Sequence, residues 1–178
     1  MELFTTELPG LKIIRPRIFQ DMRGTFVKTF HQGQFREFGM DFTPREEFFS
    51  TSSKNVLRGM HFQLPPAAHA KLVYCIAGRV LDVVLDLRKN SPAFGRSFAS
   101  EISAANHEMI FIPPGFAHGF LSLEEAAITV YQTSTVHSPV HDAGVRWDSF
   151  GFNWPVENPI LSERDKMFPV LREFDSPF

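Results

Sequence analysis

The sequence predicts an all-β domain with a few short helical turns, and two observations support that prediction. Eight short runs rich in β-branched, aromatic and other apolar residues follow one another along the chain. Glycine and proline turn signals separate these runs, at the spacing typical of a β-sandwich or barrel. The runs are LKIIRPRIF, GTFVKTF, NVLRGMHFQ, KLVYCIAG, RVLDVVLDLR, EMIFIPPG, AHGFLSL and AITVYQTSTV.

Helical pattern is confined to two short segments, QGQFREFG and SERDKM. With 178 residues, of which 43% are hydrophobic, the chain is long enough to bury one sizeable core. We therefore expect one domain over residues 1–178. Beyond about Asp142 the pattern becomes irregular, and we expect a C-terminal arm that wraps the barrel.

Charge and targeting signals exclude several classes of partner. The formal net charge is −2, and neither sign is gathered into a long block, which argues against nucleic acid or an anionic membrane as a partner. The N-terminal segment lacks the pattern of a signal peptide, and no apolar run is long enough to span a bilayer. A cytoplasmic protein is expected. The only cysteine, Cys75, excludes an intrachain disulfide and is interpreted as a small buried hydrophobe.

Strand alternation predicts a polar cavity beside an apolar core. Lys71 and Val73 fall on one face of their strand, and Thr129, Tyr131 and Thr133 fall on one face of theirs. We expect an apolar second sheet to cover the opposite face and leave this mixed polar set to line a cavity.

The run NVLRGMHFQ places a cation and an imidazole inside an otherwise apolar strand. Strict alternation puts Arg58 and His61 on opposite faces. If both serve one site, Gly59 marks a bulge or bend that re-aims them.

His61 has two interpretations. It is either a core histidine satisfied by a backbone carbonyl or a general base oriented by a carboxylate. Asp165 is the candidate partner. However, Ser162 and Asp165 also have the spacing of a capping box, in which Asp165 only closes a helical turn. Both interpretations stay open at this point.

Two further polar residues have a structural and a functional interpretation. Lys71 is either a side chain that extends from a strand edge to water or a fixed cation facing a developing oxyanion. Tyr131 is either a core aromatic whose hydroxyl finds a carbonyl or a group of the site.

A metal site is not expected. The turn IPPGFAHGF contains the P-x-G-x-x-H pattern of cupin barrels, at Pro113, Gly115 and His118. A cupin metal site also needs a second histidine two residues after His61, and Gln63 stands there. With one imidazole from each half of the barrel, His61 and His118, the ligand set is smaller than the three protein ligands that a metal site requires.

Several linked motifs resemble one family. The motifs resemble, in order and spacing, the dTDP-4-dehydrorhamnose 3,5-epimerase family of cupin-like sugar epimerases; they are DMRGTF, KNVLRGMHFQ, KLVYC-x-AG, the aspartates of VLDVVLDLRKNSPAFG, IPPGFAHGF, TVYQTSTVHSP and LSERD. The resemblance extends from about Asp21 to Pro169. It implies a cupin-like jelly roll and a homodimer that shares N-terminal strands. The implied reaction is an epimerisation beside a C4 ketone, without metal or other cofactor.

The resemblance also implies residue roles. His61 would be the base, Asp165 its orienting partner, Lys71 the group that stabilises the enolate oxygen, and Tyr131 the group that returns a proton from the opposite face. Arg58 and His118 match positions that hold the sugar and diphosphate, and Arg23 and Phe26 match the nucleotide-binding segment.

Departures from the family pattern fall where the nucleotide is expected. Lys28, Glu46, Phe48 and His137 replace the residue types usual there, and we include them, with Gln63, among the substrate-binding residues. The expected substrate is therefore a nucleotide-diphospho-4-keto-6-deoxyhexose, and the sequence does not determine its nucleobase.

The sequence also leaves alternatives to this reaction. Epimerisation can occur at C3, at C5 or at both. A ketoisomerase, which would yield a 3-keto product, uses similar acid–base groups, and a non-catalytic sugar-binding cupin would bind without proton exchange. A metal-dependent cupin is the third alternative, which metal analysis and activity in the presence of a chelator would distinguish.

Overall fold

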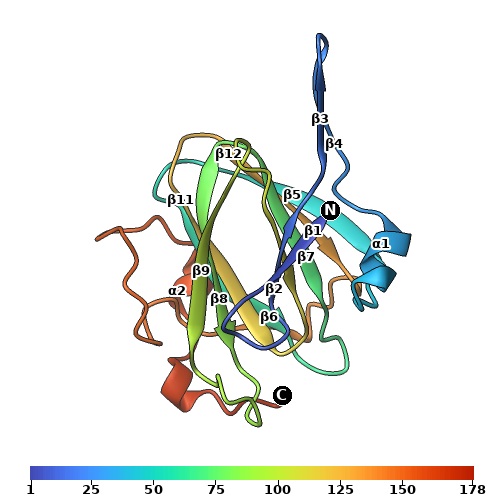
Figure 1. The fold of residues 1–178 in the computed structure, drawn as a ribbon. Coiled ribbons are helices and arrows are strands. Elements are labelled where there is room, and N and C mark those ends of the chain that lie inside the picture. The colour runs from blue at the N-terminus through green and yellow to red at the C-terminus, as the bar shows by residue number, and fades with distance from the viewer.

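Two antiparallel β-sheets packed face to face form the body of the protein in this computed structural model, which describes residues 1–178 (Figure 1). The six-stranded sheet consists of β1 (Glu2–Thr5), β2 (Lys12–Arg15), β5 (Glu46–Ser52), β7 (Lys71–Ala77), β10 (Met109–Ile112) and β12 (Ala127–Thr133). The five-stranded sheet consists of β6 (Leu57–Gln63), β8 (Arg79–Asp86), β9 (Ser97–Ser103), β11 (Phe116–Ser122) and β13 (Asp142–Gly144). The strand orders are β1-β2-β10-β7-β12-β5 and β13-β6-β11-β8-β9. This β-sandwich confirms the predicted fold class.

Both predicted helical segments form helices. Helix α1 spans Gln32–Glu37, helix α2 spans Glu163–Lys166, and a 3-10 turn covers Leu171–Glu173. Side chains cap the start of each α-helix, because His31 Nδ1 accepts the Gln34 N–H and Ser162 Oγ accepts the Asp165 N–H. Neither helix is long and apolar enough to cross a membrane.

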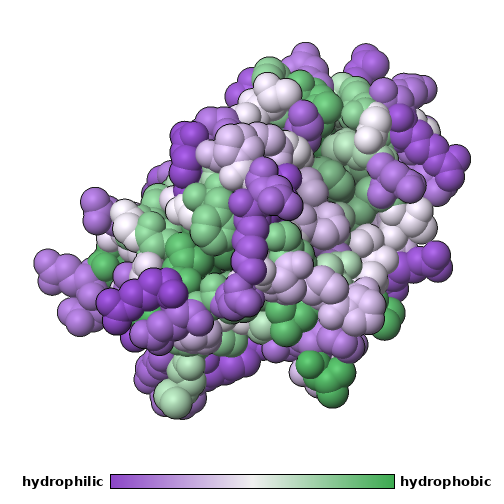
Figure 2. Space-filling view, turned by 90° about the horizontal axis from the view of Figure 1, so that it is seen from below, coloured by the Kyte–Doolittle hydropathy of each residue, from purple (hydrophilic) through white to green (hydrophobic).

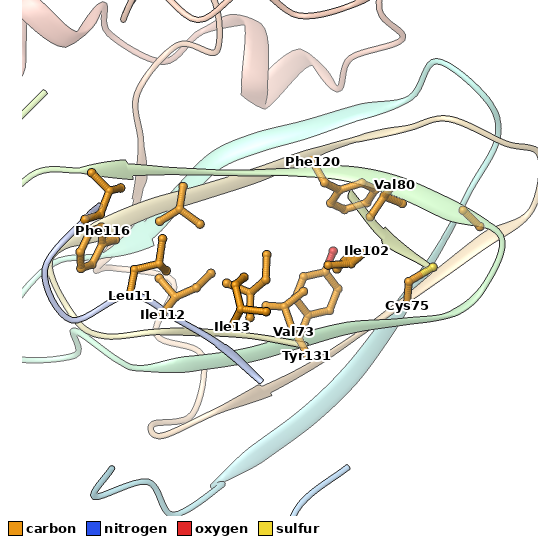
Figure 3. Close-up of a cluster of buried hydrophobic side chains, with 14 of the residues drawn as sticks. Leu11, Ile13, Val73, Cys75, Val80, Ile102, Ile112, Phe116, Phe120 and Tyr131 are labelled. Atoms are coloured by element: carbon orange, nitrogen blue, oxygen red, sulfur yellow. The ribbon is translucent and has the colours of Figure 1, made fainter. Parts of the chain in front are cut away.

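The central core lies between the sheets (Figure 3). Val73, Cys75 and Tyr131 extend from the six-stranded sheet toward Phe116 and Phe120 of the five-stranded sheet (Figure 3). Cys75 is buried there, as the sequence predicted.

The expectation about which face the second sheet covers was wrong. The strand face that carries Lys71 and Tyr131 is the face packed against the five-stranded sheet, and its apolar members join the core while its polar members line a cavity. The opposite face, with Leu72, is covered by Phe35 of α1 and by Phe42. Core and cavity therefore share the space between the sheets, because one strand face changes from apolar to polar along its length.

A two-stranded hairpin projects from this body (Figure 1). Its strands are β3 (Ile18–Asp21) and β4 (Gly24–Val27). The run LKIIRPRIF, expected as one strand, divides at Pro16 into β2 and β3, since proline has no N–H for a sheet ladder. Phe19 and Phe26 lie on opposite strands of the hairpin and are exposed.

The chain after β13 covers the outer face of the five-stranded sheet. Val145 and Trp154 are buried there against Leu57, Val83 and Leu85. This segment also carries α2 to a position beside β6, where it contributes to the site described below. On the face shown in Figure 2, apolar patches are separated by hydrophilic side chains.

Candidate active site

A cavity of about 390 Å³ lies between the two sheets. β5, β7 and β12 supply one wall, and β6 and β11 supply the other. Nine of the residues expected at the site line this cavity: Glu46, Phe48, Arg58, His61, Gln63, Lys71, His118, Tyr131 and His137.

A bulge in β6 turns Arg58 and His61 to the same cavity. His61 lies opposite His118 of β11, and Arg58 lies opposite Phe120, so β6 has one extra residue between these pairs. Gly59 has a φ of 150°, and a Cβ there would lie 2.6 Å from Gly119 Cα. The predicted bulge is confirmed, and the close approach of two strands explains why glycine occupies the position.

Asp165 is the partner of His61 in space. Its Oδ1 lies 2.8 Å from His61 Nε2, and its Oδ2 accepts the Gly59 N–H at 3.1 Å. The backbone N–H of Asp165 donates to Ser162 Oγ. The two interpretations of Asp165 are therefore compatible, since its backbone belongs to the helix cap and its carboxylate belongs to the His61 pair.

Burial and hydrogen bonding set the charge states of this pair. Burial alone would raise the pKa of Asp165, but the hydrogen bonds from His61 and Gly59 outweigh it and hold the pKa at about 2. Burial lowers the pKa of His61, and Asp165 offsets part of that effect. At neutral pH the pair is a carboxylate beside a neutral imidazole, which is the protonation state of a general base ready to accept a proton.

Lys71 and Tyr131 lie on the wall that faces His61. Lys71 Nζ donates to the His61 carbonyl at 3.1 Å, and burial lowers the pKa of Lys71 to about 8. The Tyr131 hydroxyl lies 3.3 Å from Ser50 Oγ, and Phe48 stacks on the ring at a centroid distance of 4.8 Å. Burial raises the pKa of Tyr131, so the phenol keeps its proton at neutral pH.

His118 has a buried carboxylate partner, Asp82, which the sequence analysis placed among the family motifs but gave no role. Its Nε2 lies 2.7 Å from Asp82 Oδ2, and neither side chain is more than 4% exposed. The sequence held a signal, because an aspartate inside the apolar run RVLDVVLDLR must have a partner once it is buried. The second aspartate of that run, Asp86, binds Arg88 and Ser91 away from the cavity.

Thr133, which was expected to line a cavity, does so, but other cavity residues were missed: Ser50, His69, Asp142 and Arg164. Arg164 forms ion pairs with Asp142 and Asp165, so it adds a positive charge beside the His61 pair. Each residue type is common on protein surfaces, and no local pattern sets them apart in the sequence.

Three residues expected to bind the nucleotide lie outside this cavity. Arg23 is on the projecting hairpin and pairs with Asp21, Phe26 is 60% exposed, and Lys28 follows β4 at the surface. Within one chain, therefore, the structure does not bring the hairpin residues together with His61.

Gln63 lines the cavity, but its amide is engaged by its neighbours. Its Oε1 accepts the Ser138 N–H at 2.6 Å, and its Nε2 donates to the Ala67 carbonyl at 2.9 Å. No group of three or more His, Cys, Asp or Glu side chains is arranged to hold a metal ion.

The fold and the cavity define a class: a cupin-like β-sandwich enzyme with acid–base groups on two facing walls. Residues 5–173 match the family model described as dTDP-4-dehydrorhamnose 3,5-epimerase. A protein of that name from Shigella flexneri is 42% identical over 168 residues, which cover 93% of each chain. The chain belongs to the dTDP-4-dehydrorhamnose 3,5-epimerase family, and it is an isomerase of the epimerase type.

Two solved structures show the same fold with ligands. The dTDP-6-deoxy-D-glucose-3,5-epimerase of Legionella pneumophila, in complex with dTDP-4-keto-L-rhamnose, has a TM-score of 0.93 at 33% identity, covering 98% of this chain and 94% of that chain. A 3′-monoepimerase from Streptomyces bikiniensis, in complex with dTDP-quinovose, has a TM-score of 0.89 at 33% identity, covering 94% of this chain and 86% of that chain.

Proposed function

We propose that the protein epimerises a dTDP-linked 4-keto-6-deoxyhexose at C3 and C5 through an enolate, with no metal or other cofactor. The observation that carries the proposal is the placement of the His61–Asp165 pair and of Tyr131 on facing walls of one cavity. Inversion at carbon requires a proton to leave one face and return to the other. Two acid–base groups on opposite walls meet that requirement.

His61 removes the proton. The C4 ketone makes the C–H bonds at C3 and C5 acidic, and the neutral imidazole is in the form that accepts a proton. Asp165, ionised and hydrogen-bonded to Nε2, stabilises the imidazolium that forms and holds the ring in place.

Lys71 and Tyr131 complete the cycle from the other wall. The ammonium of Lys71 stabilises the negative charge that develops on the C4 oxygen, and burial strengthens this interaction because the local dielectric is low. Tyr131, which keeps its proton at neutral pH, returns a proton to the face opposite His61.

The rest of the cavity anchors the nucleotide diphosphate. The Arg58 guanidinium is oriented by Ser52 Oγ and by the Thr51 carbonyl, and a guanidinium can donate two hydrogen bonds to a phosphate. We assign Arg58 and His118 to the diphosphate and sugar. Glu46, Phe48 and His137 are assigned to the nucleobase.

The hairpin supplies the remaining nucleotide contacts in a homodimer. Arg23 and Phe26 lie outside the cavity of their own chain, yet Phe19 and Phe26 expose large apolar surfaces on a projecting element. We propose that this hairpin reaches the cavity of a second copy, where Arg23, Phe26 and Lys28 contact the nucleotide. Comparing the affinities for dTDP, UDP, CDP and GDP tests which nucleobase the site prefers, and a clear preference for dTDP is expected.

The decisive test is proton exchange followed by NMR in deuterated water. Incubation with dTDP-4-keto-6-deoxyglucose should place deuterium at C3 and C5 and yield the doubly inverted sugar. His61→Ala should abolish both exchanges. Unchanged exchange in that variant would show that His61 is not the base, and a 3-keto product would identify a ketoisomerase.

A further inference from the structure

His69 is a cavity residue that the proposed mechanism does not use. It precedes β7 and stands two residues before Lys71, and both side chains line the cavity. Its Nε2 atom is buried and has no hydrogen-bond partner. A buried polar atom without a partner is costly, and the side chain that carries this atom lines the cavity, so a bound ligand is a candidate partner for it.

The amide of Gln63 fixes the state of the imidazole. Ser138 offers a backbone N–H, which can only donate, and Ala67 offers a carbonyl, which can only accept. These two contacts leave one orientation for the Gln63 amide, with Oε1 toward Ser138 and Nε2 toward Ala67. For the second amide hydrogen the nearest acceptor is His69 Nδ1, at 3.0 Å, and the Thr135 hydroxyl and the Val136 carbonyl lie farther away, at 3.4 and 3.5 Å. An amide nitrogen cannot accept, so at 3.0 Å Gln63 Nε2 donates and His69 Nδ1 accepts.

The imidazole must therefore carry its proton on the unpartnered nitrogen. Nδ1 accepts from Gln63, so in the neutral ring the hydrogen lies on Nε2. No carboxylate forms an ion pair with His69, and the neighbouring cation Lys71 disfavours a charge on its ring. Burial, reinforced by Lys71, lowers the pKa of His69 to about 3, so the ring is neutral over the whole working range of pH. His69 is a fixed, uncharged N–H donor.

We propose that His69 Nε2–H donates a hydrogen bond to the substrate sugar at or next to the C4 oxygen, beside Lys71. This inference rests on the proposed function, because it assigns the donor to the 4-keto sugar. A neutral donor suits that position, since it stabilises an enolate oxygen more than a ketone oxygen without giving up its proton. The acceptor would also satisfy the one polar atom of His69 that the protein leaves unpaired.

Kinetics of two variants test the contact. His69→Phe keeps a ring but has no donor, and it should lower kcat about tenfold or more with a smaller change in KM. His69→Gln keeps an N–H at similar reach and should recover most of the loss. Affinity for dTDP alone should equal that of the wild type in both variants, because the proposed contact is with the 4-keto hexose, which dTDP lacks.

A spectroscopic measurement on a protein with His69 intact keeps the proposal testable even if His69→Phe fails to fold. The ¹⁵N NMR signals of the imidazole should show the Nε2–H form from pH 5 to 8. The Nε2–H signal should shift when dTDP-4-keto-6-deoxyglucose is added to the inactive His61→Ala variant, and it should not shift with dTDP.

The outcomes separate this inference from the proposed function. If wild-type protein exchanges deuterium normally and His69→Phe has wild-type kcat, the contact is disproved and the function stands. A proton found on Nδ1, or an Nε2–H signal that is insensitive to the sugar, would also overturn it. If wild-type protein exchanges no deuterium with the sugar, the proposed function itself fails.

Discussion

His61 and Asp165 meet across 104 residues of chain, with His61 Nε2 at 2.8 Å from Asp165 Oδ1. The second carboxylate oxygen of Asp165 accepts the N–H of Gly59, the residue at the bulge that turns His61 into the cavity. One buried carboxylate therefore holds both the imidazole and the backbone that aims it. The position of the base therefore depends on the carboxylate of Asp165, which holds the imidazole, and on Gly59, which sets the backbone at the bulge.

Removing the charge of Asp165 should impair chemistry more than folding. Asp165→Asn keeps an oxygen for the Gly59 N–H but loses the negative charge that stabilises the imidazolium. We expect kcat to fall by about two orders of magnitude or more, with a modest fall in melting temperature, because the lowered pKa of Asp165 shows that its charge also stabilises the folded state. Asp175→Asn is the matched control, because Asp175 is 93% exposed and pairs only with Lys89. A kcat within a few-fold of wild type for Asp165→Asn would contradict the assigned role.

Tyr131→Phe should separate proton removal from proton return. His61 is intact in this variant, so deuterium should still enter C3 and C5, whereas formation of the inverted sugar should slow by about 10²-fold or more. NMR measures both rates in one reaction. Ser50→Ala, which removes the hydroxyl beside Tyr131, is the control and should have a much smaller effect. Equal loss of wash-in and inversion would refute the role of Tyr131.

The pH dependence of kcat/KM should be bell-shaped. The base works as neutral His61, whose pKa burial lowers below its ordinary value near 6.5, so activity rises with pH through that lowered pKa. The ammonium of Lys71 is lost as pH rises through about 8, so activity falls there. Lys71→Met should lower kcat at every pH and remove the alkaline limb. Persistence of that limb in Lys71→Met would assign it to another group.

Gly59→Ala should destabilise the fold by steric collision. The added Cβ would lie 2.6 Å from Gly119 Cα, at a φ of 150°. We expect the free energy of unfolding to fall by about 2–4 kcal/mol in urea titrations. Gly151→Ala is the control, because Gly151 has a positive φ of 77° but no atom within 4 Å of the added Cβ. Its cost should be about 1 kcal/mol, which is the backbone term alone. Equal costs for the two variants would show that the contact with Gly119 is unimportant.

Mixed dimers should reveal whether the hairpin acts on a second copy. One protomer carries His61→Ala, and the other carries Arg23→Ala with Phe26→Ala. Each homodimer should be inactive or nearly so. If hairpins act on the partner, the mixed dimer contains one site with an intact His61 and an intact hairpin, so mixing should restore activity. If mixing restores nothing although mixed dimers form, the hairpin does not serve the partner's site.

The strands that the sequence analysis predicted and those it missed differ in their place in the sheets. All eight predicted runs contain strands, and the four unpredicted strands of the sandwich, β1, β5, β9 and β13, are the four sheet edges. An edge strand is partly exposed, so its sequence carries polar residues such as those of EEFFSTS in β5, which is mostly exposed. Apolar periodicity reports burial, and therefore it identifies the central strands and not the edges.

The residues of the candidate site also divide into those that the sequence could indicate and those that it could not. His61, Lys71, Tyr131 and Arg58 could be singled out because a charged or titratable group inside an apolar strand is anomalous in the sequence itself. His69 and Arg164 could not, since they lie outside the predicted strands, His69 in the loop before β7 and Arg164 in the short helix α2. Their importance arises only from what surrounds them, which for His69 is a glutamine held by two backbone groups.

The sequence by itself determined the all-β class, the central strands and the family, because each depends on local patterns or on ordered motifs, and it indicated the bulge at Gly59 on the condition that Arg58 and His61 share one site. Only the tertiary structure decided that Asp165 reaches His61, that Asp82 reaches His118, and that the hairpin stands away from the cavity of its own chain. The physical reason is distance along the chain. Each of these relationships joins or separates segments that are far apart in sequence, and their meeting depends on how the two sheets pack.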